Sequence, residues 1–257
     1  MNLNQTNSLN TSQQTRPTPW GLKMTFVFSL IIALLFIGLQ IMVSFGLYLF
    51  KITQHPELKL NDYIDSLQNN GLLLSLSTCT TTLLLSPLIL LFVWLRKNIS
   101  IRDYLHLYPV NRLFLIRWLG VSLLLSLTFD SLNTLLKRPI VPEFMIEVYQ
   151  TSEHLPLLWF TIVVGGPLFE ELFFRGFLLE SFRFSKLRSL GAVLLVTFLW
   201  TIIHTQYDFF ELFQILTMGL FLSIARLQTN SLTMSIIMHS FLNFYATLET
   251  AFIVGNQ

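Results

Sequence analysis

The sequence predicts an all-α fold: a polytopic transmembrane helical bundle of about seven or eight helices. Apolar residues make up 53% of the 257-residue chain and charged residues only 12%, whereas a soluble domain carries about 25% charged residues. Long stretches contain no charge at all. The alternation of polar and apolar residues that marks barrel strands is absent, so membrane-spanning helices are the expected structure.

Seven apolar runs approach or reach the length of about 20 residues that a helix needs to cross a bilayer. The fifth run is short, and the fourth contains Gly165-Gly166-Pro167, where a division would raise the count to eight. The runs are Met24–Phe50, Leu72–Leu95, Leu113–Leu135, Leu155–Leu179, Leu187–Ile203, Phe209–Leu227 and Ser231–Val254.

The distribution of polar residues divides the chain into three regions. Residues 1–22 form a polar N-terminal tail that we expect to be flexible, and residues 23–154 supply the N-terminal transmembrane helices. Residues 155–254 hold nearly every group that could do chemistry. The first apolar run is too long for a signal-peptide core, so we expect it to remain as a span. No inverted internal repeat of the transporter type is visible.

Basic residues predict a cytoplasmic N-terminus, because Lys and Arg are enriched in cytoplasmic loops. This orientation puts ten basic residues inside and four outside, leaving aside Arg117 and Arg175 within apolar runs. The inside set is Arg16, Lys23, Arg96, Lys97, Arg102, Arg112, Arg183, Lys186, Arg188 and Arg226, and the outside set is Lys51, Lys59, Lys137 and Arg138.

The charge and cysteine content argue against a nucleic-acid-binding protein and against a fold stabilised by disulfides. The net charge of +2 is small and scattered, so nucleic acid is not an expected partner. The single cysteine, Cys79, cannot form an internal disulfide. We expect it to be a small buried helix residue.

Two adjacent glutamates in the fourth run are predicted to have different roles. Glu171 and Arg175 are four residues apart and share a helix face, which favours an ion pair. Glu170 points away from Arg175 and stays available as a general base. The alternative is a Glu-Glu-Arg patch at a solvated helix end. The preceding Gly165-Gly166-Pro167 is either a point where the helix restarts or a packing kink.

Two later runs add His204, at the end of the fifth run, and the pair His239 and Asn243 in the seventh. Ionisable groups at membrane depth are costly and indicate function when they face the bundle interior. His204 alone could be an interfacial histidine, and His239 with Asn243 could bond a neighbouring helix. Together with the glutamates, these residues could activate water and stabilise the oxyanion of amide hydrolysis.

The three motifs, in this order, resemble the CPBP family of CAAX proteases and bacteriocin-processing enzymes, also called the Abi family. The residues are Glu170, Glu171 and Arg175; Trp200 and His204; and His239 and Asn243. The resemblance covers about Leu155 to Ile253, and it departs from the family at Trp200, where phenylalanine is usual. It implies an intramembrane endopeptidase that is CAAX prenyl protease-like. It also implies that Glu170 and His204 activate water, that His239 and Asn243 form the oxyanion hole, and that Glu171 and Arg175 support the site.

No cofactor and no metal is expected for this chemistry. A helix with His-Glu-x-x-His is absent, although Glu170, His204 and His239 could still hold a metal in a metal-dependent version of the protease. The alternative from another class is a non-catalytic membrane protein, either transporter-like or a scaffold, in which the same histidines relay protons or join helices.

The expected partners are the lipid bilayer and a membrane-associated protein or peptide substrate. The sequence does not identify this substrate or show that it is prenylated. From the distribution of the family and the compact size of the chain, we expect the protein in the inner (plasma) membrane of a bacterium.

Overall fold

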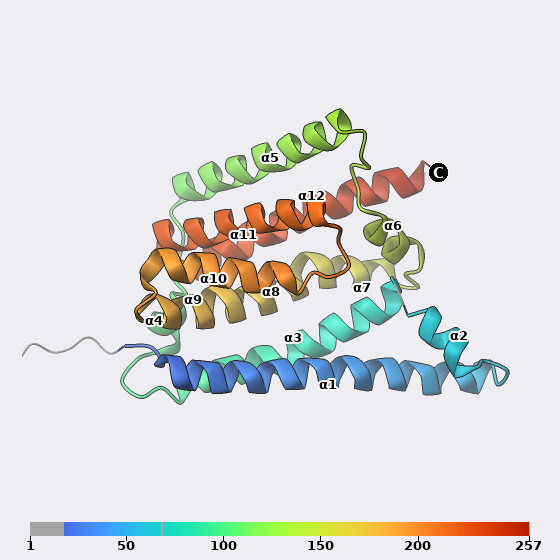
Figure 1. The fold of residues 1–257 in the computed structure, drawn as a ribbon, viewed down its shortest axis with the longest axis horizontal. Coiled ribbons are helices and arrows are strands. Elements are labelled where there is room, and N and C mark those ends of the chain that lie inside the picture. Colours follow the sequence, from blue (N-terminus) through green and yellow to red (C-terminus); the bar gives the residue numbers. More distant parts are fainter. Residues whose placement is uncertain (1–17, 68, 257) are drawn as a thin grey trace, which may run out of the picture.

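The computed structural model describes residues 18–67 and 69–256, and every regular element in these residues is helical (Figure 1). The all-α prediction is therefore confirmed. The long helices are α1 Leu22–Gln54, α3 Gly71–Trp94, α5 Arg112–Leu135, α10 Arg188–Ile202, α11 Phe209–Thr229 and α12 Leu232–Gly255, with a continuous helical segment, Leu155–Arg183, between α5 and α10. The short helices are α2 Leu60–Asp65, α4 Ile101–Leu105 and α6 Glu143–Gln150. The predicted flexible tail falls, over residues 1–17, outside the described residues.

Five helical segments are long and apolar enough to cross a membrane: α1, α3, α5, Leu155–Arg183 and α11. Helix α10 is also apolar, but its 15 residues make it shorter than these five segments. The last helix, α12, has 24 residues but is absent from these five because His239, Asn243 and Glu249 make it more polar. Helix α12, which carries His239, and helix α10, which precedes His204, are thus the least typical membrane spans.

The segment Leu155–Arg183 runs without a break through Gly165-Gly166-Pro167. It consists of α7 Leu155–Phe160, the π-helical turn η1 Thr161–Gly165, α8 Gly166–Glu171, the π-helical turn η2 Leu172–Leu178 and α9 Leu179–Arg183. The idea that the helix restarts at Gly165-Gly166-Pro167 is therefore wrong, and so is the division into two spans. Proline lacks an N–H and clashes with the preceding turn of an α-helix, and the wider π-turn accommodates it here.

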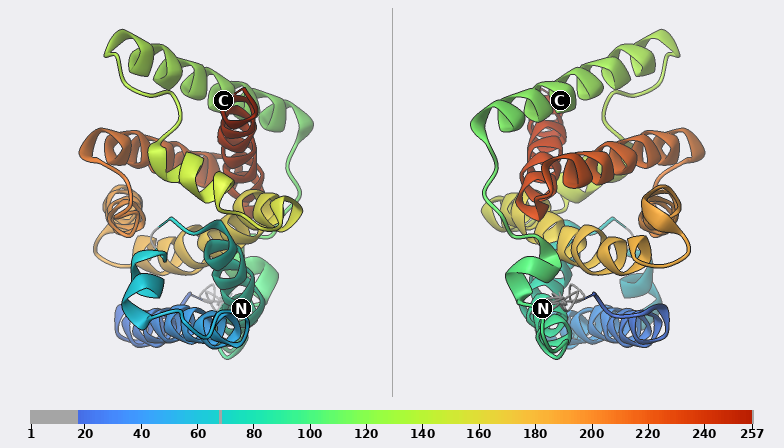
Figure 2. Two further views of the ribbon diagram at one scale, coloured as in Figure 1. Left: turned by 90° about the vertical axis from the view of Figure 1, so that its right-hand side faces the viewer. Right: turned by 90° about the vertical axis from the view of Figure 1, so that its left-hand side faces the viewer.

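The helices form a bundle with α1 at one edge and α5 at the opposite edge (Figures 1 and 2). Helix α3 packs between α1 and α8, and α12 packs against α5, α8 and η1. Helix α8 therefore lies inside the bundle, between α3 and α12.

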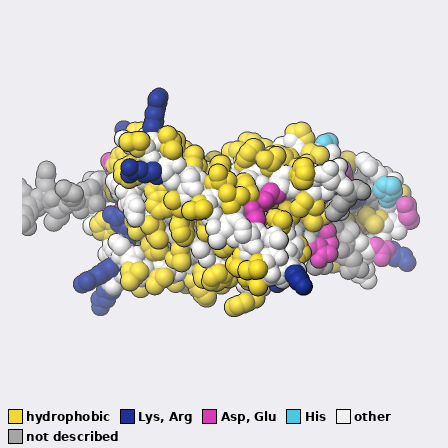
Figure 3. Space-filling view, turned by 90° about the horizontal axis from the view of Figure 1, so that it is seen from above, with side chains coloured by type: hydrophobic (Ala, Val, Ile, Leu, Met, Phe, Trp, Pro, Cys, Tyr) yellow, Lys and Arg dark blue, Asp and Glu magenta, His cyan; other side chains and the backbone are white. Residues whose placement is uncertain are grey.

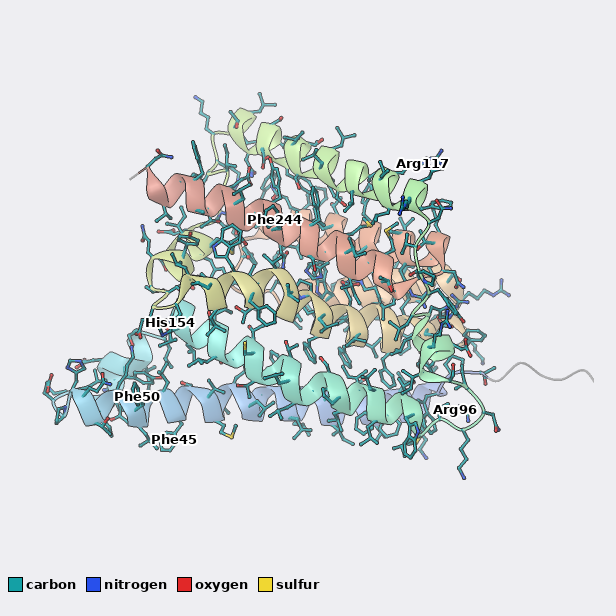
Figure 4. All side chains as sticks on the ribbon, turned by 180° about the vertical axis from the view of Figure 1, so that it is seen from behind. Phe45, Phe50, Arg96, Arg117, His154 and Phe244 are labelled. Carbon is teal, nitrogen blue, oxygen red and sulfur yellow. The ribbon has the colours of Figure 1, made fainter. Side chains whose placement is uncertain are left out.

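The outer surface of the bundle suits a lipid environment. Phe45 and Phe50 on α1 are 57% and 59% exposed and lie on its outer side (Figure 4). Arg96 and Arg117 lie at one end of the bundle, and His154 lies at the other (Figure 4). Hydrophobic side chains cover most of the face shown in Figure 3, with Lys and Arg mostly towards one end. The protein is therefore an integral membrane protein whose apolar belt separates two polar ends.

Candidate active site

The predicted site residues come together around one cavity of about 270 Å³. Glu170 reaches it from α8, His204 from the loop after α10, and His239 and Asn243 from α12. The predicted convergence of Glu170 with the two histidines is thus present in the structure. Glu171 and Arg175 lie behind this wall and are fully buried.

The buried ion pair predicted from the four-residue spacing is present. Nη1 of Arg175 donates to Oε1 of Glu171 at 2.8 Å, and both side chains are 0% exposed. Nη2 of Arg175 donates to the Gly219 carbonyl at 3.2 Å. The guanidinium also lies over the indole ring of Trp200, 4.5 Å from its centroid. These contacts supply the partners that a buried charge needs, so the pair is held in one geometry.

Glu170 points into the cavity, away from Arg175, as the helical spacing predicted. Its side chain is 24% exposed, and its Oε2 accepts a hydrogen bond from Nε1 of Trp200 at 2.5 Å. Sequence reasoning noted Trp200 only as a departure from the family motif and missed this donor. The available signal was an indole N–H one helical turn before His204.

Trp200 also positions both histidines. Its ring lies edge-on to the imidazole of His204, with 4.9 Å between centroids, and to that of His239, with 5.4 Å. The indole is only 3% exposed. Gly219 on α11 allows this packing, because a Cβ there would lie 2.8 Å from the Trp200 ring. A single rigid aromatic side chain therefore touches four of the ionisable groups at the site: Glu170, Arg175, His204 and His239.

A backbone carbonyl in the last turn of α10 fixes the tautomer of His204. Nδ1 of its imidazole lies 2.7 Å from the Trp200 carbonyl oxygen. Because a carbonyl only accepts, Nδ1 must carry the proton, which leaves Nε2 of the neutral ring as an acceptor. His204 thus presents a basic nitrogen, Nε2, that can accept a hydrogen bond.

The loop that carries His204 is held at its far end by the start of α11. Asp208 and Glu211 form a capping box there, and Arg138 pairs with Asp208. The N–H of Glu211 at the helix start, and then Arg138, hold the pKa of Asp208 below its ordinary value. The negative carboxylate suits the helix N-terminus, so this loop is anchored on both sides.

His239 connects the two glutamates. Its Nδ1 lies 3.0 Å from Oε1 of Glu171, and its Nε2 lies 4.0 Å from Oε2 of Glu170. The ring is 5% exposed. Since a carboxylate at Nδ1 keeps a proton on that nitrogen, Nε2 is a donor only when the ring is an imidazolium.

Asn243 makes a contact that sequence reasoning did not foresee. Its Nδ2 donates to the carbonyl oxygen of Ile162 in η1 at 2.8 Å. In the π-helical register the Gly166 N–H bonds the carbonyl five residues earlier, that of Thr161. The next donor in this register would be Pro167, which has no N–H. Asn243 therefore satisfies a carbonyl that Pro167 leaves open, and one of its two amide hydrogens remains for a ligand.

Metal ligands do not cluster at this site: across residues 18–67 and 69–256, no group of three or more His, Cys, Asp or Glu side chains could hold a metal ion.

Comparisons with known proteins identify the region around this cavity. A family model described as "Type II CAAX prenyl endopeptidase Rce1-like" matches residues 152–245. Neither the curated proteins nor the solved structures gave a match. The matched segment contains both glutamates, both cavity histidines and Asn243. Residues 152–245 are therefore similar to this family of CAAX prenyl endopeptidases.

Proposed function

We propose that the protein is a glutamate-dependent intramembrane endopeptidase and that residues 155–254 are its catalytic region. The observation that carries the proposal is the shared cavity: Glu170, His204, His239 and Asn243 all line it, from α8, the loop after α10 and α12. The substrate is a membrane-associated protein or peptide. An interior cavity of this kind lets a peptide and water meet away from lipid.

Water is activated between Glu170 and His204. The water donates one hydrogen to a carboxylate oxygen of Glu170 and the other to Nε2 of His204, which is free to accept because Nδ1 bonds the Trp200 carbonyl. Its lone pair then adds to the peptide carbonyl carbon while Glu170 takes the proton. General-base catalysis of this type contributes about 10²–10⁴-fold in rate.

The oxyanion that forms is stabilised by α12. Nε2–H of His239, in the imidazolium form, and the remaining amide hydrogen of Asn243 donate to it. The carboxylate of Glu171 at Nδ1 of His239 stabilises this positive charge, and Arg175 holds that carboxylate in place. Glu170 then returns the proton to the leaving nitrogen, and the C–N bond breaks.

The decisive experiment compares Glu170→Gln with Glu153→Gln in the purified protein, reconstituted in lipid and given membrane-soluble peptides. Glu153 is exposed and does not line the cavity, so its variant controls for the loss of one carboxylate. We expect cleavage by the wild type and by Glu153→Gln, and background cleavage by Glu170→Gln. Full activity of the Glu170 variant would reject the mechanism.

We also propose a bacterial plasma membrane with the N-terminus in the cytoplasm. The support for this orientation is the asymmetry of basic residues, ten on the cytoplasmic side and four on the other. Reporter fusions after Asn98 and after Pro139 test the orientation, because these loops follow consecutive spans and should lie on opposite sides. A cytoplasmic reporter signal after Pro139 would overturn it.

A further inference from the structure

Helix α5 contributes a polar wall to the cavity, although the proposed catalytic residues come from other elements. Ser126, Asp130 and Asn133 lie on one face of α5, since they are spaced by four and three residues. All three line the cavity. Opposite them, α12 contributes Tyr245 and Glu249. This wall extends the site along α12, beyond Asn243.

The carboxylates of this wall lie together. The Tyr245 hydroxyl donates to Oδ2 of Asp130 at 2.8 Å, and Glu249 interacts with both Asp130 and Tyr245. Two carboxylates held together in a membrane-embedded bundle repel each other unless they share a proton or a cation lies between them. A cation between Asp130 and Glu249 would remove that repulsion.

The described lining offers no lysine or arginine to offset them. Its carboxylates are Asp130, Glu170, Glu211 and Glu249, and it includes no Lys or Arg of the described chain. Glu211 is already engaged with the N–H of Asp208, and Arg138 is paired with Asp208. No lysine or arginine of the described lining therefore competes with a cationic ligand for Asp130 and Glu249.

A second observation at the same wall concerns Ser126. The residue is 4% exposed and its Oγ has no hydrogen-bond partner within the described chain. One turn earlier on α5, Ser122 bonds the carbonyl four residues before it in the usual helical way. The Ser126 hydroxyl does not, although it is buried against the cavity. A buried hydroxyl without a partner is costly, and a donor group bound in the cavity would satisfy it.

We propose that Asp130, Glu249 and Ser126 form a subsite that binds the cationic side chain of a lysine or arginine in the peptide substrate. An ammonium group has three donors and no acceptor, which matches two carboxylates and a hydroxyl oxygen. The proposal deepens the proposed function and rests on it. It gives the enzyme a preference for basic membrane-associated peptides.

The geometry also limits where the basic residue lies in the substrate. Glu249 follows His239 by ten residues on α12, which corresponds to about 15 Å of helix. An extended peptide advances about 3.3–3.6 Å per residue. The basic residue is thus within about four residues of the scissile bond.

The test uses paired peptides that carry either lysine or norleucine at each position within four residues of the cleaved bond. For wild-type protein we expect one lysine position to lower KM about tenfold or more, as close charge pairs do in other interfaces. Asp130→Asn and Glu249→Gln should raise KM for that lysine peptide and leave the norleucine peptide unchanged. Glu153→Gln should behave as wild type. Equal kcat/KM for lysine and norleucine peptides at every position would overturn the subsite.

Two further measurements separate the possible failures. Ser126→Ala removes one hydroxyl and no charge, so it tests the subsite even where the carboxylate variants do not fold; an unchanged KM for the lysine peptide counts against it. Binding of both peptides to Glu170→Gln protein tests the subsite without cleavage. Tighter binding of the lysine peptide supports the subsite even if the wild type cleaves neither peptide. A lack of cleavage would then reject only the proposed function. Saturable Ca²⁺ or Mg²⁺ binding that is lost in Asp130→Asn, with no lysine preference, would instead mark a metal site and overturn the subsite.

Discussion

Trp200 donates its indole N–H to Glu170 across 2.5 Å, while its ring contacts the imidazoles of His204 and His239. Phenylalanine, the usual residue of the family motif at this position, could pack against the histidines but could not make this hydrogen bond. The tryptophan therefore orients the carboxylate that we propose as the base, in addition to packing beneath it.

Trp200→Phe should lower kcat by about 10- to 100-fold and leave KM nearly unchanged. The reason is the loss of a hydrogen bond to a charged group, worth about 1.5–3 kcal/mol, with the aromatic packing kept. Steady-state cleavage of one peptide measures both constants. Trp159→Phe is the matched control, because Trp159 packs on Phe244 away from Glu170. An unchanged kcat in Trp200→Phe would mean that Glu170 is oriented by other groups.

Glu171→Gln should act mainly on stability. It removes the charge that offsets Arg175 while both side chains are fully buried, and breaking a buried pair costs about 3–5 kcal/mol. We expect a clear fall in Tm in detergent or lipid. Glu170→Gln, at a partly exposed position, should leave Tm close to that of the wild type. Similar losses of Tm in the two variants would contradict the different environments of these carboxylates.

The apolar runs and the four-residue spacing of charges predicted much of this structure. Helix positions followed from hydropathy, and the pairing of Glu171 with Arg175 followed from helical geometry. The unbroken passage through Gly165-Gly166-Pro167 could not be predicted, because it depends on donors from other helices. Thr82 donates to the Gly165 carbonyl, and Asn243 to that of Ile162.

Side chains isolated in the sequence were the least predictable part of the site. Asp130 stands alone in its apolar run, and nothing local shows whether it faces lipid, water or protein. Its place beside Tyr245 depends on the packing of α5 against α12, more than 100 residues later in the chain. The hydrogen bond between Trp200 and Glu170 likewise joins two helices.

Removal of metal should leave cleavage intact. The proposed mechanism assigns the polarisation of the carbonyl to His239 and Asn243, and an asparagine amide is a good oxyanion donor but a poor ligand for transition metals. Chelator treatment, metal analysis and an activity assay on the same sample check this. Stoichiometric zinc whose removal abolishes activity and whose return restores it would make Glu170, His204 and His239 ligands instead.

Asn243→Ala should lose two separate functions, which a second substitution can divide. Loss of an oxyanion donor should lower kcat about 10²–10³-fold, and the unbonded Ile162 carbonyl should cost about 1–3 kcal/mol of stability. Pro167→Ala restores an N–H in the register that the π-turn leaves vacant. In the double variant Pro167→Ala/Asn243→Ala we therefore expect Tm to recover and kcat to stay low. Recovery of both would show that Asn243 only holds η1 in place, because a carbonyl partner in the helix would then replace everything that the amide does.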